Sequence, residues 1–356
     1  MRIRDRLSIW FMLVMLVPLL VVSGVAAWQA RRELKQSTGG HLAALAAEKA
    51  DAIAMTIHNR IHEASVLAAT HEVRQAVREA NAAYEDRDDQ EITDGIAQLD
   101  AEWIETKRSG GSPTAKRILG NRTSNFLKTY QMRNSDRYGE IFLTDVRGAA
   151  IGQTMILSDY NQADESWWQA GLRVKEGSAF IDDRGYDETA DALAMGIVVP
   201  VFDGDRPAGV LKINYKVREA LDIVAGLNPN ERTTALLVRS LGTIVAHSGE
   251  AHGDTLTTDE KAVLSLDSGG FAWYAHEDER YVMGYSPVAA DISARIPNPG
   301  ERKGISGEKW MPSRWWLMIQ VPHAVALAAV GRFTLATLTG ALVALLCAIG
   351  MALIAA

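Results

Sequence analysis

Both ends of this chain are apolar and uncharged. Residues 7–28 contain no charged side chain, and neither do residues 333–356. About 20 apolar residues are enough for a helix to cross the hydrocarbon core of a bilayer. We therefore predict two transmembrane helices, at 7–28 and 333–356, with a short cytoplasmic tail at residues 1–6. Because the chain then crosses the membrane twice, all residues between the two helices lie on one side of it.

The first apolar stretch has an alternative interpretation as a cleaved signal peptide. Arg2, Arg4 and Arg6 precede it, and residues 25–27 resemble a cleavage site. The stretch is longer than the apolar region of a typical signal peptide, which favours an uncleaved anchor. Basic residues are equally frequent on its two sides, so the positive-inside rule does not decide the orientation. The signal-like start and the acidic middle of the chain favour an extracytoplasmic location for residues 29–323.

Charge and cysteine content exclude several classes of function. The chain has 37 Lys and Arg residues against 44 Asp and Glu residues, so it has no basic surplus with which to bind a nucleic-acid backbone. The single cysteine, Cys347, excludes an internal disulfide and a zinc site built from cysteine pairs. No nucleophile elbow, HExxH motif or phosphate-binding loop is present. We therefore expect neither an enzyme nor a bound metal or cofactor.

A long helical pattern follows the first apolar stretch. Apolar residues recur at spacings of three and four from Leu42 to Ala68, and the pattern continues to about Ala80. Such a rod is about 60 Å long at 1.5 Å per residue. We interpret residues 29–94 as a stalk helix that carries motion to the first membrane helix, and we expect a parallel homodimer through it. Small residues at every fourth position from Gly340 either form a second dimer contact or arise by chance in an alanine-rich helix.

The middle of the chain contains a repeated pattern. Two stretches consist of apolar runs on either side of a turn that includes a glycine. They are residues 141–154, with Gly148, and residues 235–248, with Gly242. Each stretch predicts a β-hairpin, because glycine readily adopts the positive φ that such turns require.

A second pair of strands follows each hairpin. Residues 196–215 form two apolar runs around a polar turn, and residues 281–288 pair with residues 314–322 after a long loop. The sequence thus predicts two similar antiparallel-sheet units in tandem, at 95–218 and 219–323. Short strands with occasional helices indicate an α+β fold and not a parallel βαβ sheet.

At this level of detail the chain resembles a known family. Four segments in order carry the resemblance: residues 140–148, 159–171, 185–203 and 208–221. Together with the stalk and the membrane helices, they resemble the double Cache (dCache) sensor domain, whose two modules are PAS-like. The resemblance covers residues 30–323. It implies a ligand-binding module distal to the membrane and a second module proximal to it, both outside the inner (cytoplasmic) membrane of a bacterium, in the periplasm.

The resemblance also implies a small-molecule sensor in signal transduction, for example in chemotaxis. Domains of this family signal to chemoreceptor, histidine kinase or cyclic-dinucleotide output domains, and the 356 residues contain no such output domain. Two interpretations follow. The chain is either the sensory part of a transmembrane receptor or a stand-alone, membrane-tethered adaptor module that binds a periplasmic protein partner.

The resemblance places the ligand pocket between the sheet of the distal module and the segment around Trp167. Aromatic residues and carboxylates are combined there, which suits a small ligand with a positive charge or several hydroxyl groups. One ring of an adjacent tryptophan pair normally lies in the core, and acidic loop residues are often only solvated. The candidate ligand-binding residues are Tyr160, Glu165, Trp167, Trp168, Asp182, Asp187 and Asn214.

One subgroup of the family binds free amino acids. It holds the ligand carboxylate with an arginine two residues before the matching tryptophan, where this chain has Glu165. It holds the ligand amine with an aspartate in the strand that begins with a Gly-Val dipeptide, where this chain has Asn214. Because a glutamate repels a carboxylate, we expect an amine or a polyol in preference to a free α-amino acid.

Overall fold

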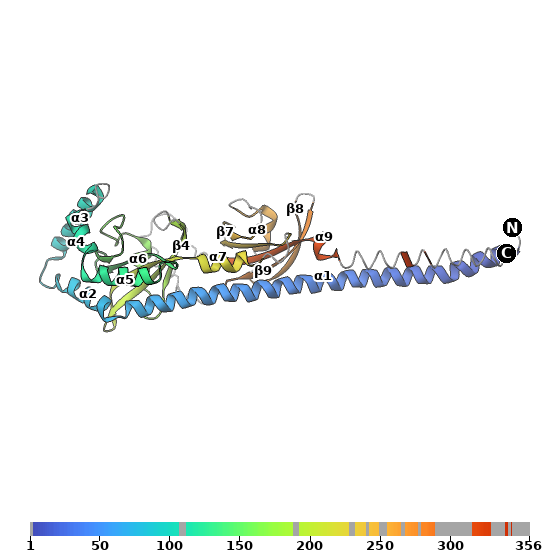
Figure 1. Cartoon of the computed structure of the whole chain (residues 1–356), viewed down its shortest axis with the longest axis horizontal. Helices are drawn as coiled ribbons and strands as arrows, with labels where there is room; N and C mark the ends of the chain where they lie inside the picture. Colours follow the sequence, from blue (N-terminus) through green and yellow to red (C-terminus); the bar gives the residue numbers. More distant parts are fainter. Residues whose placement is uncertain are drawn as a thin grey trace.

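One long helix runs alongside both sheets of the molecule. The computed structural model describes residues 3–106, 112–187, 192–227, 232–239, 242–248, 255–264, 268–276, 279–288, 315–328, 339–340 and 343. Helix α1 (Ile3–Ala68) contains 66 residues, so it is about 100 Å long at 1.5 Å per residue. In Figure 1 it passes along the distal module and the proximal module and continues beyond them.

Helix α1 ends earlier than its apolar pattern predicts. Thr70 has extended backbone angles (φ −63°, ψ 152°), and its hydroxyl donates to the carbonyl oxygen of Leu67 at 2.8 Å. A new helix, α2 (His71–Ala82), begins after this break. The apolar pattern nevertheless continues past the break, because Val73 and Val77 of α2 pack into the same core as α1.

Each module is built on one five-stranded antiparallel sheet. The distal sheet has the order β2-β1-β5-β4-β3, and the proximal sheet has the order β7-β6-β10-β9-β8. The distal strands are β1 (Tyr138–Asp145), β2 (Ala150–Gln153), β3 (Phe180–Asp187), β4 (Ala192–Asp203) and β5 (Arg206–Lys216). The proximal strands are β6 (Thr234–Arg239), β7 (Ile244–His247), β8 (Gly270–His276), β9 (Glu279–Pro287) and β10 (Trp315–Pro322). The predicted tandem of two similar sheet units with an α+β fold is confirmed.

The two predicted hairpins are also confirmed. Strand β1 pairs with β2, and β6 pairs with β7, both antiparallel. Their turns contain Gly148 and Gly242, each with φ 85°. Strands β3 and β8 were not predicted. Both are edge strands, and β3 contains Asp182, Asp183 and Arg184 in succession, so it lacks the alternation of apolar and polar residues that reveals a strand.

The apolar stripe of α1 is covered by the chain's own sheets. Its residues between Leu42 and Ile61 belong to the main core cluster, and α1 contacts β4, β9 and β10. Strand β9 approaches closely because it has a glycine there: a Cβ atom on Gly284 would lie 2.2 Å from the carbonyl carbon of Leu42. The apolar stripe of α1 therefore packs against sheets of the same chain. A homodimer through the stalk stays a prediction, and it would need the opposite face, where Met55 and His58 are exposed.

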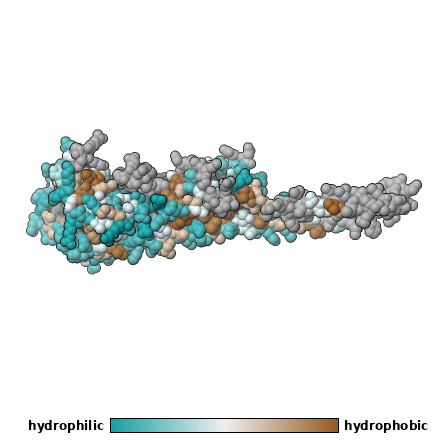
Figure 2. Space-filling model, viewed as in Figure 1, coloured by the Kyte–Doolittle hydropathy of each residue, from teal (hydrophilic) through white to brown (hydrophobic). Residues whose placement is uncertain are grey.

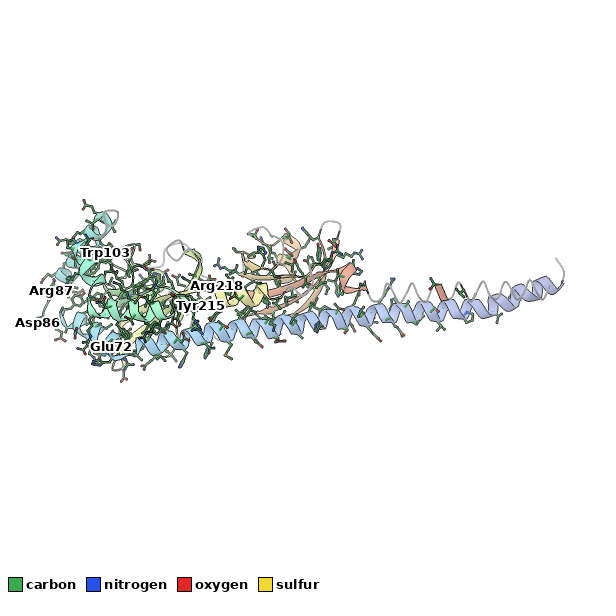
Figure 3. The ribbon with its side chains drawn as sticks, viewed as in Figure 1. Glu72, Asp86, Arg87, Trp103, Tyr215 and Arg218 are labelled. Carbon is green, nitrogen blue, oxygen red and sulfur yellow. The ribbon has the colours of Figure 1, made fainter. Side chains whose placement is uncertain are left out.

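Different helices cover the two faces of the distal sheet. Helices α1, α2 and α5 (Arg122–Arg133) pack on one face. Helices α3 (Asp89–Thr106), α4 (Pro113–Leu119) and α6 (Ser166–Gly171) form a layer on the other face. Trp103 of α3, labelled in Figure 3, is fully buried in this second layer. Helix α7 (Arg218–Ala225) joins the modules, and α8 (Thr258–Leu264) and α9 (His323–Ala326) belong to the proximal one.

The predicted membrane segments are only partly described. Within the described residues, no helix is long and apolar enough to cross a membrane. Most of residues 333–356, and many side chains between residues 7 and 20, lie outside the described part of the chain. The backbone of residues 7–28 belongs to α1. On the face shown in Figure 2, hydrophilic residues cover most of the distal module.

Candidate functional site

The register of the distal sheet brings several polar residues onto one face. Asp182, Gly196 and Asn214 lie opposite one another on β3, β4 and β5. Lys212 lies two residues before Asn214 on β5 and is opposite Phe142 of β1. Because side chains alternate between the faces of a sheet, all of these positions face the layer of α3, α4 and α6. Two predicted residues, Asp182 and Asn214, thus share a face with a lysine that was not predicted.

A buried ion pair lies at the centre of this face. The Lys212 Nζ atom is 2.7 Å from Asp182 Oδ2, and the two side chains are only 10% and 8% exposed. The same Nζ atom lies 4.2 Å from the ring centroid of Trp167 and 6.0 Å from that of Phe142. The two rings meet edge to face at 5.6 Å. The ammonium group is therefore held by a carboxylate and by two aromatic rings, an arrangement that favours a cation.

Gly196 provides the space for this pair. A Cβ atom on Gly196 would lie 2.8 Å from Lys212 Cε and 3.0 Å from Asp182 Cβ. Contacts this short are repulsive, so any larger residue at this position would displace the lysine or the aspartate.

A second polar pair extends the site towards β1. Asn214 Nδ2 donates to Glu140 Oε2 at 3.2 Å, and Glu140 is 8% exposed. Together, Glu140, Asn214, Asp182 and Lys212 place two carboxylates, an amide and an ammonium group on one sheet face. Glu140, Asp182 and Lys212 are buried, and buried polar groups are costly unless they are paired, as they are here.

Of the remaining predicted residues, Trp168 and Tyr160 belong to the same buried cluster as Trp167 and Phe142. Trp168 is in the core, where its Nε1 atom donates to Thr144 Oγ1 at 2.9 Å. Tyr160 is also in this core, 5.7 Å from the ring of Trp103, and burial raises its pKa to about 12. Glu165 precedes α6, and its carbonyl oxygen accepts from the backbone N–H of Trp168. Asp187 ends β3, and its side chain is outside the described part of the structure.

Four residues of the site were missed in the sequence: Phe142, Lys212, Glu140 and Gly196. The best available signal was Lys212, which lies within the apolar run of β5. Lysine is rarely buried unless it is paired, so a lysine in a central strand indicates a polar partner on the same face. No group of three or more metal-ligating side chains is present among the described residues.

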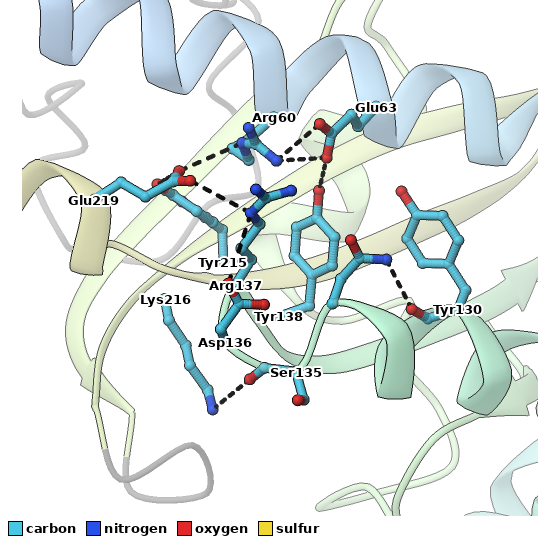
Figure 4. A network of polar contacts seen from close by, with 11 residues as sticks. Arg60, Glu63, Tyr130, Ser135, Asp136, Arg137, Tyr138, Tyr215, Lys216 and Glu219 are labelled. Atoms are coloured by element: carbon cyan, nitrogen blue, oxygen red, sulfur yellow. Dashed lines mark hydrogen bonds and ion pairs between the residues drawn. The ribbon is translucent and has the colours of Figure 1, made fainter.

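A separate polar network lies on the opposite face of the distal sheet, next to α1 (Figure 4). Arg60 Nη1 lies 2.7 Å from Glu63 Oε2, and the Tyr138 hydroxyl also bonds to Glu63. Glu219 of α7 lies within 3.6 Å of Arg60 and 3.4 Å of Arg137, so the network joins α1, β1 and α7. Burial raises the pKa of Tyr138 and of Tyr215.

The tandem antiparallel sheets and the long first helix agree with the fold that the sequence resemblance implies. Comparison with known protein families finds no match, and no curated protein matches the sequence. Solved structures of similar shape do exist. One is the ligand-binding domain of the Pseudomonas fluorescens chemoreceptor CtaA with L-isoleucine, at 12% identity and a TM-score of 0.49, covering 84% of this chain and 98% of that one.

Two further similar structures come from other chemoreceptors. The ligand-binding domain of Pseudomonas aeruginosa PctC with GABA has 15% identity and a TM-score of 0.45, covering 79% of this chain and 98% of that one. The corresponding domain of Campylobacter jejuni Tlp3 with 4-methylisoleucine has 12% identity and a TM-score of 0.44, covering 77% of this chain and 94% of that one. All three are ligand-binding domains of bacterial chemoreceptors.

One expectation from the sequence is wrong. We expected an amine or a polyol in preference to a free α-amino acid, whereas the similar structures contain amino acids or GABA. The expectation considered only Glu165 as the partner of a ligand carboxylate. The structure shows a cation, Lys212, beside Trp167 in the same layer. Repulsion between Glu165 and a ligand carboxylate is therefore not sufficient to exclude an amino acid from this site.

Proposed function

We propose that this chain is the extracytoplasmic small-molecule sensor of a membrane-anchored signal-transduction receptor. The ligand site is the face of the distal sheet around Lys212 and Asp182. The observation that carries this proposal is the buried ion pair enclosed by Trp167 and Phe142. A buried ion pair contributes little net stability compared with apolar packing, which favours a role in binding for this one.

The ligand in this proposal carries both an amino and a carboxyl group. Its ammonium group replaces that of Lys212 on Asp182 and lies over the ring of Trp167, where a cation–π interaction stabilises it. Its carboxylate binds the displaced ammonium group of Lys212. A zwitterion thus satisfies both buried charges, whereas a ligand with a single charge leaves one of them without a partner. Asn214 and Glu140 lie beside the pair and provide further hydrogen bonds.

Membrane anchoring is the second part of the proposal. Large hydrophobic side chains are exposed along the first part of α1: Trp10, Val14, Val17, Val21, Val22, Val25 and Trp28. Exposed apolar surface of this extent favours contact with lipid. We propose transmembrane helices at 7–28 and 333–356, a stalk at 29–94 whose helix is broken at Thr70, the distal module at 95–218 and the proximal module at 219–323. The anchored chain then places both modules outside the cytoplasmic membrane.

A ligand screen tests the proposed function. The full chain, purified in detergent micelles, is heated with each of the twenty L-amino acids and with GABA. A ligand at one hundred times its dissociation constant adds about 2.7 kcal/mol to the free energy of unfolding, and the melting temperature then rises by a few degrees. We expect at least one of these compounds to produce such a rise.

Two variants identify the site. Lys212→Met removes the ammonium group at nearly constant length, and we expect it to abolish the rise in melting temperature. The matched control is Lys216→Met on the same strand, because Lys216 is only half-buried and its ammonium group donates to the Ser135 carbonyl oxygen and not to a carboxylate. That control should retain the rise. If no amino acid changes the melting temperature of the native chain, the sensor proposal fails and the adaptor interpretation replaces it.

A further inference from the structure

Two consecutive residues of β3 contact two different modules. Asp182 belongs to the candidate site of the distal module. Asp183, the next residue, bonds to the proximal module. Its Oδ1 atom accepts from Arg239 Nη2 at 2.7 Å, and its Oδ2 atom accepts from Arg239 Nε at 2.9 Å. The Trp315 Nε1 atom also donates to Asp183 Oδ2, at 2.7 Å.

This contact is buried and has strong geometry. The side chains of Asp183 and Arg239 are 6% and 19% exposed, and Trp315 is 4% exposed. Two parallel hydrogen bonds between an arginine and a carboxylate are among the strongest polar contacts in proteins. Arg239 and Trp315 lie opposite each other on β6 and β10. One carboxylate of the distal module therefore holds two adjacent strands of the proximal sheet.

The contact of Asp183 bears on the position of Asp182 because both residues lie on β3, a strand with an irregular register. It is the edge strand of the distal sheet and pairs only with β4. Its register with β4 shifts between Asp182 and Gly185, directly after the residue of the site. Such a bulge leaves part of the strand without regular ladder bonds. Besides its own ion pair with Lys212, Asp182 is therefore restrained through the bonds that the next residue, Asp183, makes to the proximal module.

We infer that the proximal module helps to position the distal ligand site, with Asp183 as the positioning residue. This inference rests on the proposed function. Arg239 and Trp315 hold Asp183, and Asp183 holds Asp182 against Lys212. The coupling is reciprocal, as thermodynamic linkage requires. A ligand that moves Asp182 also changes the contact at Trp315, the first residue of β10, which leads into α9 and towards residues 333–356.

The test needs no ligand, since it follows the reactivity of Lys212. The full chain in detergent micelles is treated briefly with acetic anhydride, and acetylation of each lysine is measured by peptide mass spectrometry. A lysine held by a buried carboxylate reacts slowly. Loosening Asp182 should therefore raise the acetylation rate at Lys212, by about tenfold if a charge-assisted hydrogen bond is lost. The acetylation rate of Lys216 on the same strand is the control, because a general loosening of the fold would raise it as well.

Three variants act on the proposed restraint. Asp183→Asn weakens both partners' bonds, and Arg239→Lys retains the charge but removes the paired geometry. Both should raise the Lys212 rate and leave the Lys216 rate unchanged. Combining the two changes should add little, because they act on one contact. Trp315→Phe removes a single donor and should have a smaller effect.

Two controls separate this inference from the proposed site. Asp182→Asn should raise the Lys212 rate directly. Arg78→Gln removes an exposed ion pair with Asp203 at the far end of β4, and it should leave the rate unchanged. If Asp182→Asn raises the rate and the variants at Asp183 and Arg239 do not, the positioning role is overturned while the site stands. If Asp182→Asn has no effect, the ion pair itself is not formed, and both proposals fail.

Discussion

The distal and proximal modules have the same strand order but different chemistry on equivalent rows of the sheet. The two hairpins align Phe142 of β1 with Leu236 of β6. The residue opposite Phe142 is Lys212, whereas the residue opposite Leu236 is Met318. Met318 is fully buried and belongs to an apolar cluster with Leu236 and Tyr285. The same place in the fold thus holds an ammonium group in one module and a thioether in the other.

The next row of each sheet shows the same contrast. Asp182 lies opposite Gly196 in the distal sheet, and Ala272 lies opposite Met283 at the equivalent place in the proximal sheet. The methionine fills the space that the glycine leaves open. At these two places the fold therefore accommodates either an ion pair or apolar side chains, whereas the proximal row keeps one polar residue, Gln320, which accepts from the Tyr274 hydroxyl.

The largest expected effect comes from placing the distal residue in the proximal module. Met318→Lys introduces an ammonium group between Leu236 and Tyr285, which cannot neutralise it. A buried charge without a partner costs about 3–5 kcal/mol, and the free energy of unfolding should fall by that amount. Chemical denaturation of the full chain, followed by tryptophan fluorescence, measures it. A loss below about 1 kcal/mol would show that the two faces are electrostatically alike.

Placing the proximal residue in the distal module, as Lys212→Met, should lower the free energy of unfolding by less. A second substitution should restore most of this loss. Lys212→Met removes the ammonium group that neutralises the buried Asp182 carboxylate, and we expect a loss of about 3 kcal/mol. Adding Asp182→Ala reproduces the proximal residues at both positions and should restore stability to within about 1 kcal/mol of the native chain. The ligand response should remain absent in the double variant. A double variant no more stable than Lys212→Met alone would contradict this electrostatic explanation.

The equivalent turn glycines should differ in their tolerance of alanine. Gly148 and Gly242 have the same φ of 85°, so both substitutions carry the same backbone strain. A Cβ atom on Gly148 would lie 2.6 Å from the backbone nitrogen of Ala163, whereas one on Gly242 would meet only the flexible side chain of Lys261. We expect losses of about 2 kcal/mol for Gly148→Ala and about 1 kcal/mol for Gly242→Ala. Equal losses would mean that strain alone determines the cost.

The smallest expected effect is a pH dependence that involves Tyr160. Burial raises its pKa to about 12 in the folded chain, against about 10 when unfolded. The unfolded chain therefore loses this proton first, and stability falls as the pH rises from about 10 towards 12. Tyr160→Phe should remove about 1 kcal/mol of the loss measured between pH 9 and pH 11. An identical alkaline loss in the variant would show that Tyr160 is not involved.

Local patterns in the sequence predicted much of the architecture. The hairpins followed from glycines between apolar runs, and α1 followed from apolar residues at helical spacing. These features depend on neighbours within a few residues, which is why they are visible without a structure. The break at Thr70 was not visible, because α2 continues the same apolar face into the same core.

The site was predicted only in part. Trp167, Asp182 and Asn214 were predicted as ligand-binding residues, which stays a prediction, and the structure brings Asp182 and Asn214 onto one sheet face with Lys212 and Gly196 through strand register. Residues 30 positions apart in the chain, such as Lys212 and Asp182, become neighbours when β5, β4 and β3 align. A pattern within a few neighbouring residues cannot predict which strands pair or in which register.

The sequence by itself determined the tandem of two similar sheet units, the amphipathic stalk and the apolar ends, because hydrophobic periodicity and turn chemistry are local properties. The tertiary structure decided which face of the stalk is buried, which charges are paired and how the modules meet at Asp183. Those outcomes depend on register and packing between distant segments. A buried charge finds its partner only after the strands have aligned, and it is this pairing that turns one of two equivalent sheets into a candidate sensor site.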